Sequence, residues 1–190
     1  NAAMPEGETV LLSAARTGSA AAIDVLLEHG AQIDSRENWH GETPLIWAAA
    51  ENHASAVRTL LAHGADPNIR SAPQVWEKRR ASQSVLPLGE WTPLFYAARA
   101  NALDAGKALI DYSLDHLADA GVARSVVNVH YLADALEAHL AKRKAPAVVL
   151  SDERDCLLET GGGMVKAAGA GLLPDPFFCL NSDNIWLDGP

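Results

Sequence analysis

Three features in the C-terminal half of the chain have residue types and positions that could support chemistry. Asp183 and Glu153 each follow a short apolar run, and Gly161, Gly162 and Gly163 are consecutive. Open α/β sheets bind their ligands at the carboxyl ends of strands, which is where both acids are expected to lie. Taken alone, an acid after a strand is equally typical of a turn or a cap, and a glycine triplet is typical of a flexible loop.

Alternating helices and strands must position these residues. Periodic apolar positions predict helices at 106–117, 132–144 and 164–168, and short β-branched or apolar runs predict strands at 125–130, 147–151 and 177–180. Helices alternating with buried strands favour a layered α/β segment with a parallel sheet.

The N-terminal half is organised differently, by an internal repeat. The stretch Glu42–Asn68 opens with Thr43-Pro44, continues through an alanine-rich helix and closes at Gly64. Related stretches begin at Thr9 and Thr92. Thr43 is suited to cap a helix, Pro44 to its first turn, and Gly64 to the left-handed position that ends the second helix. A period of about 33 residues with this content resembles the ankyrin repeat.

The repeats set the predicted domain boundaries. Ankyrin repeats are expected over 1–105 and a partial α/β domain over 106–190; the repeats cover about 7–38, 41–70 and 89–105, with an inserted loop at 71–88. The insertion follows from Thr92, which lies 49 residues after Thr43. Long insertions in repeat proteins often lie on the binding face. Trp76 in this loop is a candidate partner anchor, or it folds back to cover the stack.

The other polar and aromatic residues of this half indicate recognition. Trp39 and Trp91 are expected to pack in turns, and His29 and His63 to end helices. No nucleophile–base pair or metal-ligand cluster is evident from the spacing in this half. A protein partner on the ankyrin face is therefore predicted, although its identity cannot be read from the sequence.

Bulk composition excludes several classes of function. Of the 190 residues 48% are hydrophobic, enough for a sizeable core, and the formal charge of −9 argues against nucleic acid as a partner. No apolar run is long enough to cross a bilayer and no signal peptide is evident, so a cytoplasmic location is expected. Cys156 and Cys179 lack metal or redox spacing and are expected to be reduced and half-buried. The opening residues suggest that the native N-terminus lies upstream.

The second half resembles nucleotidyltransferases that join a nucleoside triphosphate to a sugar 1-phosphate. The resemblance is carried by GKALIDYSLDHLADAGV, VVNVHYLADALEAHL, LSDERDCLLETGGGMVKA and PFFCLNSDNIWLDGP, in family order over 106–190. The subgroup suggested is bacterial, of the mannose-1-phosphate guanylyltransferase or N-acetylmuramate-1-phosphate uridylyltransferase type. The fold implied is an incomplete Rossmann-like α/β segment.

The resemblance implies roles for particular residues. Asp183 would hold the Mg²⁺ that bridges the triphosphate and the sugar phosphate, because a hard cation needs an oxygen ligand. Asn181 would reach the bound sugar or nucleotide, and the backbone of Gly161, Gly162 and Gly163 would approach the nucleotide. Glu153 would contact the base.

The family's other parts are not found in the sequence. Its first strand with a G-x-G-T-R loop and a following lysine is replaced by ankyrin repeats, and the sugar-binding half is expected to be missing beyond Pro190. Losing the phosphate cradle removes most of a phosphoryl-transfer catalyst. The joint near Ala105-Gly106 indicates a fusion, which is natural, an assembly artefact or engineered.

Two hypotheses follow. The first is a protein-binding module joined to a catalytically incomplete core. The second is a Mg²⁺-dependent nucleotidyltransferase that another chain or missing residues complete.

Overall fold

The computed structural model describes residues 2–73, 89–156 and 158–179. The chain divides into two compact units. Unit 1 extends to Leu109 and unit 2 covers Ile110–Asn181. The boundary lies inside a single long helix, so one helix contributes residues to both units.

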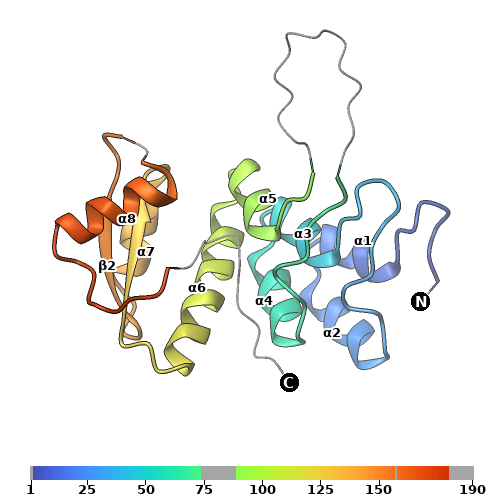
Figure 1. Ribbon diagram of the computed structural model, residues 1–190. Helices are drawn as coiled ribbons and strands as arrows, with labels where there is room; N and C mark the ends of the chain where they lie inside the picture. The colour runs from blue at the N-terminus through green and yellow to red at the C-terminus, as the bar shows by residue number, and fades with distance from the viewer. Residues whose placement is uncertain (1, 74–88, 157, 180–190) are drawn as a thin grey trace, which may run out of the picture. The chain divides into compact units, whose positions relative to one another are not determined.

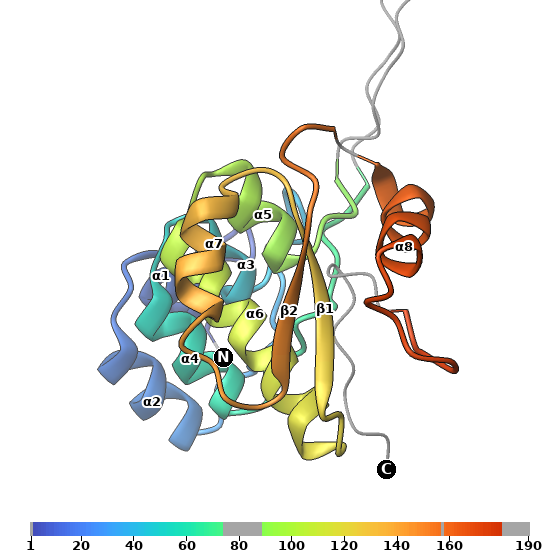
Figure 2. The same ribbon diagram turned by 90° about the vertical axis from the view of Figure 1, so that its left-hand side faces the viewer.

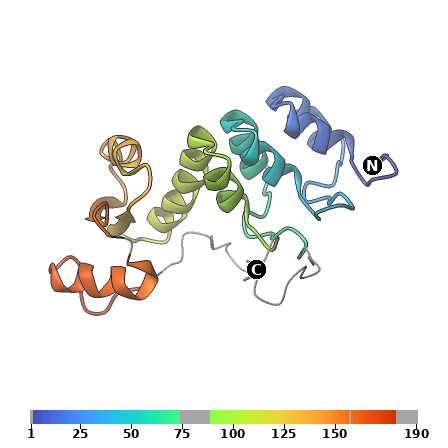
Figure 3. The same cartoon turned by 90° about the horizontal axis from the view of Figure 1, so that it is seen from above.

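Unit 1 consists of three helical hairpins (Figure 1). Its helices are α1 (Val10–Arg16), α2 (Ala20–Glu28), α3 (Pro44–Ala50), α4 (Ala54–Ala62), α5 (Pro93–Arg99) and the first part of α6 (Leu103–Asp119). Seen from above, the hairpins stack side by side along the chain (Figure 3). Each hairpin alone exposes an apolar face, and stacking buries these faces as one continuous core.

The first helix of each hairpin begins in the same way. Thr9, Thr43 and Thr92 are the N-caps, and the side-chain oxygen of each accepts a backbone N–H three residues later at 3.3–3.4 Å. Pro44 and Pro93 follow two of these caps, where a missing N–H costs no hydrogen bond. The repeat signature read from the sequence therefore has the structural roles assigned to it.

The core of unit 1 lies between the stacked hairpins. Its fully buried large side chains come from every hairpin and include Leu12, Ile23, Ile46, Leu60 and Leu109. The small residues Ala48 and Ala49 are also fully buried, which allows the paired helices to approach closely. This layer supplies most of the apolar burial that stabilises unit 1.

Unit 2 is a small α/β layer built on the rest of α6. Its elements are β1 (Arg124–Val129), α7 (Ala133–Leu140), β2 (Ala147–Asp152) and α8 (Glu159–Gly169). β1 and β2 are parallel, with Arg124 opposite Ala147 and Val129 opposite Asp152. α7 covers one face of this sheet and α8 the other (Figures 2 and 3). Both the parallel sheet and the partial α/β character agree with the sequence analysis.

Three expectations for unit 2 were wrong in detail. The helix expected at 164–168 begins at Glu159 and so contains the glycine triplet. The helix expected at 132–144 ends at Leu140. Residues 177–179, which belong to the strand expected at 177–180, form no strand. Phe178 is 96% exposed, and the preceding Pro176 has no N–H to donate to a neighbouring strand.

The two cysteines also differ from expectation. Both are free, but Cys156 and Cys179 are exposed rather than half-buried, because both lie in irregular segments outside the packed elements.

Within residues 2–73, 89–156 and 158–179, no helix is both long and apolar enough to cross a membrane.

Candidate functional site

The carboxyl ends of β1 and β2 bring polar side chains together in unit 2. Asn128 near the end of β1 is opposite Ser151 near the end of β2. The Glu153 N–H donates to the Val129 carbonyl at 2.8 Å, and His130 Nδ1 lies 2.7 Å from the Glu153 carbonyl oxygen. Both strands therefore end at one edge, which is where α/β sheets bind ligands.

Glu153 lies at this edge with its side chain turned toward α8. The residue is only 3% exposed, and its Oε2 accepts the N–H of Leu158, the N-cap of α8, at 3.2 Å. Its Oε1 is buried without a hydrogen-bond partner. The carboxylate faces the positive end of the helix dipole. This end of α8 is therefore poorly suited to a phosphate, whose charge Glu153 would repel, and better suited to the uncharged part of a ligand.

The three glycines of α8 lie in different surroundings. A Cβ on Gly163 would overlap Asn128 Nδ2 and come within 2.6 Å of Glu153 Oε1, so α8 contacts the sheet edge through this glycine. A Cβ on Gly162 would meet only the Leu158 side chain of the same turn. Gly161 is exposed and has no heavy atom within 4 Å of that position. Of the three, Gly161 leaves its backbone open to an incoming molecule.

Arg154 organises the loop that follows β2. Its guanidinium donates to Asp134 at 2.8 Å and to Glu137 at 2.6 Å, both on α7, and it also pairs with Asp152. The hydrogen bond to Glu137 is the main cause of a raised Arg154 pKa, and the Arg154 backbone N–H is the main cause of a lowered Asp152 pKa. Arg154 therefore ties the β2 loop to α7.

Aromatic side chains line the turns and first helices of unit 1. Trp39, expected to pack in a turn, is 75% exposed, because the turn is held together by Glu37 without it. Trp91 does pack: its ring stacks on Phe95 at 5.0 Å, and the Arg99 guanidinium lies 4.6 Å from its centroid. Phe95 itself is 46% exposed. Trp39 and Phe95 are therefore accessible aromatic side chains of the kind found at protein interfaces.

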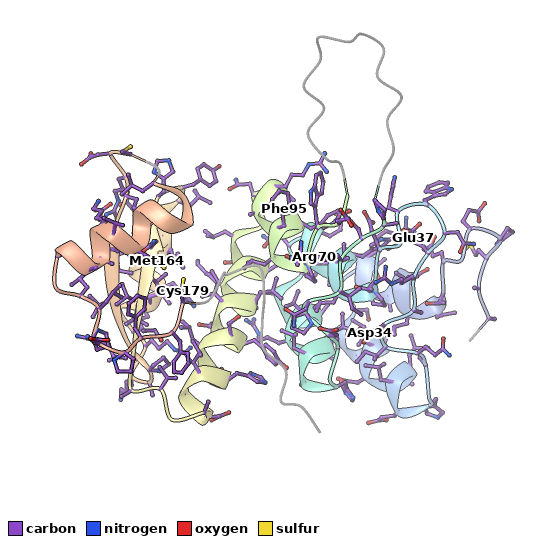
Figure 4. All side chains as sticks on the ribbon, in the orientation of Figure 1. Asp34, Glu37, Arg70, Phe95, Met164 and Cys179 are labelled. Carbon is purple, nitrogen blue, oxygen red and sulfur yellow. The ribbon has the colours of Figure 1, made fainter. Side chains whose placement is uncertain are left out.

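The segment between α2 and α3 (residues 29–43), called the finger before α3, is built around a buried carboxylate. Glu37 is 5% exposed; its Oε1 accepts the N–H groups of His40 and Glu42 at 2.9 and 2.8 Å, and its Oε2 accepts that of Trp39 at 2.6 Å. Figure 4 labels Glu37 in this finger and Asp34 just before it. No metal-ligand cluster was expected in this half, although the pattern Glu37-x-x-His40-x-Glu42 could have indicated one.

Comparison with known proteins agrees with this geometry in unit 1. Residues 1–71 match the family model described as ankyrin repeats in three copies. These residues form ankyrin repeats. The capped hairpins and projecting fingers are the physical counterpart of that match.

A second comparison gives a curated relative. The chain is similar to the N-acetylmuramate alpha-1-phosphate uridylyltransferase of Caulobacter vibrioides, with 56% identity over 88 residues. The similarity covers 44% of this chain and 36% of that relative. The chain therefore spans little more than a third of the length of this relative.

The structure places only some of the residues proposed as a site. Glu153 and Gly163 adjoin each other at the sheet edge, with Gly162 and Gly161 preceding Gly163 on α8. Asp183, Asn181 and Trp76 lie outside the described residues. Their predicted roles in metal, substrate and partner binding stay predictions, as does the nucleotide-binding role of Glu153 and the glycines.

Asp34, in the segment between α2 and α3, should make the stability of unit 1 depend on pH. Burial is the largest cause of its raised pKa, outweighing the hydrogen bond from the Asp66 N–H, and the Asp66 charge raises the pKa further. Because the folded pKa exceeds the unfolded value near 3.8, proton uptake by Asp34 stabilises the fold fully below that value, and this contribution is lost as pH rises through the folded pKa.

We therefore expect Asp34→Asn, which keeps an acceptor oxygen, to be more stable than the wild type at neutral pH. The difference should disappear in acid. Urea unfolding of both proteins across acidic and neutral pH measures it. A wild type that is the more stable protein at neutral pH would contradict this assignment.

The glycines of α8 predict opposite effects for neighbouring substitutions. Gly163→Ala should destabilise unit 2 by about 1 kcal/mol, because the ends of the Asn128 side chain and of the buried Glu153 side chain must move to admit the methyl group. Gly161→Ala should be neutral or stabilise α8 by up to about 1 kcal/mol, because its surroundings are open. Urea unfolding followed by circular dichroism compares them. Equal effects would show that α8 does not contact the sheet edge through Gly163.

Proposed function

We propose that the ankyrin unit binds a protein partner through its fingers and first helices. The observation that carries this proposal is the exposure of large aromatic side chains there, with Trp39 at 75% and Phe95 at 46%. Aromatic residues supply much of the binding energy at protein interfaces when a partner covers them. The −9 charge of the whole chain makes nucleic acid a poor alternative.

Cross-linking in cells followed by mass spectrometry tests this part. A partner of the ankyrin unit should be lost with Trp39→Ala or Phe95→Ala. It should be retained with Val25→Ala, which removes an apolar side chain from α2 whose 55% exposure lies between those of Trp39 and Phe95. Loss of the partner in all three variants, or in none, would contradict binding at the aromatic surface.

We propose further that unit 2 is a catalytically incomplete core of a sugar-1-phosphate nucleotidyltransferase. Support for the family comes from the similarity to the Caulobacter vibrioides uridylyltransferase. The parallel sheet of unit 2, with a helix on each face (Figures 2 and 3), agrees with a part of such an α/β fold.

A complete core of this kind would take a nucleoside triphosphate and a sugar 1-phosphate as ligands. The exposed backbone at Gly161 would then approach the nucleotide, and the uncharged base, rather than a phosphate, would adjoin the α8 end that Glu153 occupies. Asn181 would contact the sugar or nucleotide, and Asp183 would hold Mg²⁺. The cation would supply charge stabilisation for phosphoryl transfer. The protein's own contribution would be to hold the two substrates in place.

The alternative is a working enzyme. In that case another chain, or residues outside this sequence, supplies the glycine-rich phosphate loop and the product is an NDP-sugar. The similarity to a uridylyltransferase favours this possibility, and UTP with N-acetylmuramate 1-phosphate is then the first pair to test.

A thermal-shift titration with UTP or GTP and Mg²⁺ separates the two readings of unit 2. The incomplete-core proposal predicts no shift in the melting temperature of the whole chain. A clear stabilisation that Asp183→Ala abolishes would instead show a functional nucleotide site. If such a stabilisation is found, Gly161→Ala adds a second check, because it should then weaken nucleotide binding without lowering the stability of the unliganded chain.

A further inference from the structure

We propose that Glu37, His40 and Glu42, in the finger before α3, form a binding site for a borderline divalent cation such as Zn²⁺. One ligand atom from each residue lies within 4.8 Å of the other two. His40 Nδ1 is 3.8 Å from Glu42 Oε1. Ligand atoms around a tetrahedral zinc ion are about 3.4 Å apart. Binding would draw the three ligand atoms closer together, and His40, whose side chain is 45% exposed, has room to move.

The hydrogen bonds of Glu37 leave it able to bind a cation. An ionised carboxylate has about four acceptor positions. Glu37 uses two on Oε1, for the N–H groups of His40 and Glu42, and one on Oε2, for that of Trp39. One position on Oε2 stays open, while the three N–H bonds hold the carboxylate rigid within the finger.

Glu42 is held in place in a comparable way. Its Oε2 accepts the indole N–H of Trp47 at 2.7 Å, which leaves Oε1 directed to the His40 side. The Tyr96 hydroxyl also bonds Glu42. Hydrogen bonds of this kind fix the ligands of metal sites before the ion arrives.

The local charge favours a cation. Two half-buried or buried carboxylates face one imidazole at this finger. The neighbouring guanidinium of Arg36 donates to the carbonyl oxygens of Gly41 and Arg70 at 3.4 and 3.0 Å. An ion bound by all three side chains would balance this negative charge and cross-link the finger to the start of α3.

The ligand types indicate which cations would bind. An imidazole with two carboxylates suits Zn²⁺ or Ni²⁺, whereas Mg²⁺ and Ca²⁺ prefer oxygen ligands throughout. The site is open to solvent at His40, so a water molecule could complete the coordination. The proposed site is independent of the nucleotidyltransferase proposal and lies wholly in unit 1.

Calorimetric titration of the chelator-treated full chain with ZnCl₂ tests the proposal. We expect one saturable site whose dissociation constant rises at least about tenfold in His40→Ala and in Glu42→Gln. Glu42→Gln keeps an acceptor for Trp47 and removes only the charge. Excess Mg²⁺ should not compete, and Co²⁺ bound in place of Zn²⁺ should give the visible absorption of a tetrahedral site.

Other histidine–carboxylate pairs provide the matched control. His63 lies 2.9 Å from Asp24 and His139 lies 2.9 Å from Asp111, but each pair has only two groups. His63→Ala and His139→Ala should leave the titration unchanged. The absence of saturable binding, or an equal loss in the control variants, would overturn the site, because Zn²⁺ would then bind exposed histidines without selection.

Discussion

Glu37→Ala should lower the free energy of unfolding of the ankyrin unit by about 3 kcal/mol. The substitution removes the acceptor for three backbone N–H groups, those of Trp39, His40 and Glu42, at a residue that is 5% exposed. Those donors cannot all find new partners while the finger keeps its shape. Urea unfolding in chelator-containing buffer measures the loss without any contribution from a bound metal.

Two further variants make this expectation specific. Glu37→Gln keeps a single acceptor oxygen and should lose an intermediate amount. Glu28→Ala removes an exposed carboxylate at the end of α2 and should stay within about 0.5 kcal/mol of the wild type. If Glu37→Ala behaved like Glu28→Ala, the buried carboxylate would not be what shapes the finger.

Asn52→Ala should destabilise the start of α6 by about 2–3 kcal/mol. Asn52 lies in the turn between α3 and α4 with φ at +59°, and its Oδ1 accepts the N–H groups of Asp104 and Ala105 at 3.0 Å each. Alanine loses this cap at a cost of about 0.5–2 kcal/mol and adds about 1–2 kcal/mol for the left-handed backbone. Thermal and urea unfolding measure the total.

Substitutions at the same position separate the two causes. Asn52→Gly relieves the backbone penalty and should lose only the cap, whereas Asn52→Asp keeps the acceptor and should lose least. Equal stability of the glycine and aspartate variants would show that the side-chain oxygen does not cap α6. Because α6 contributes to both units, circular dichroism of the whole chain is the suitable signal.

The repeat architecture could be predicted because its signals are local. Thr43 and Pro44 act within one helical turn, and the caps at Thr9 and Thr92 repeat the same chemistry. The cap of α6 could not be predicted. Ala102 precedes that helix without a side-chain acceptor, and Asn52 supplies one from 52 residues earlier in the sequence. A hydrogen bond between residues of different repeats has no local sequence pattern that would predict it.

The candidate sites were harder to predict than the elements that hold them. Parallel pairing of β1 and β2 followed from their apolar runs and the helix between them. The glycine triplet predicts either a close approach for a ligand or a flexible loop, yet Gly163 lies in a helix against Glu153 and Asn128. Glycine in a helix opposes local propensity, so only the tertiary contact explains it. The finger cluster was missed because Glu37 resembled an ordinary surface acid.

We propose that a partner-binding ankyrin unit precedes an incomplete nucleotidyltransferase core. The most direct test incubates the purified chain with UTP, N-acetylmuramate 1-phosphate and Mg²⁺ and measures pyrophosphate and the nucleotide sugar, with GTP and mannose 1-phosphate as the second pair. We expect no product above the rate without protein. Turnover that Asp183→Ala abolishes would contradict it and establish the chain as an enzyme.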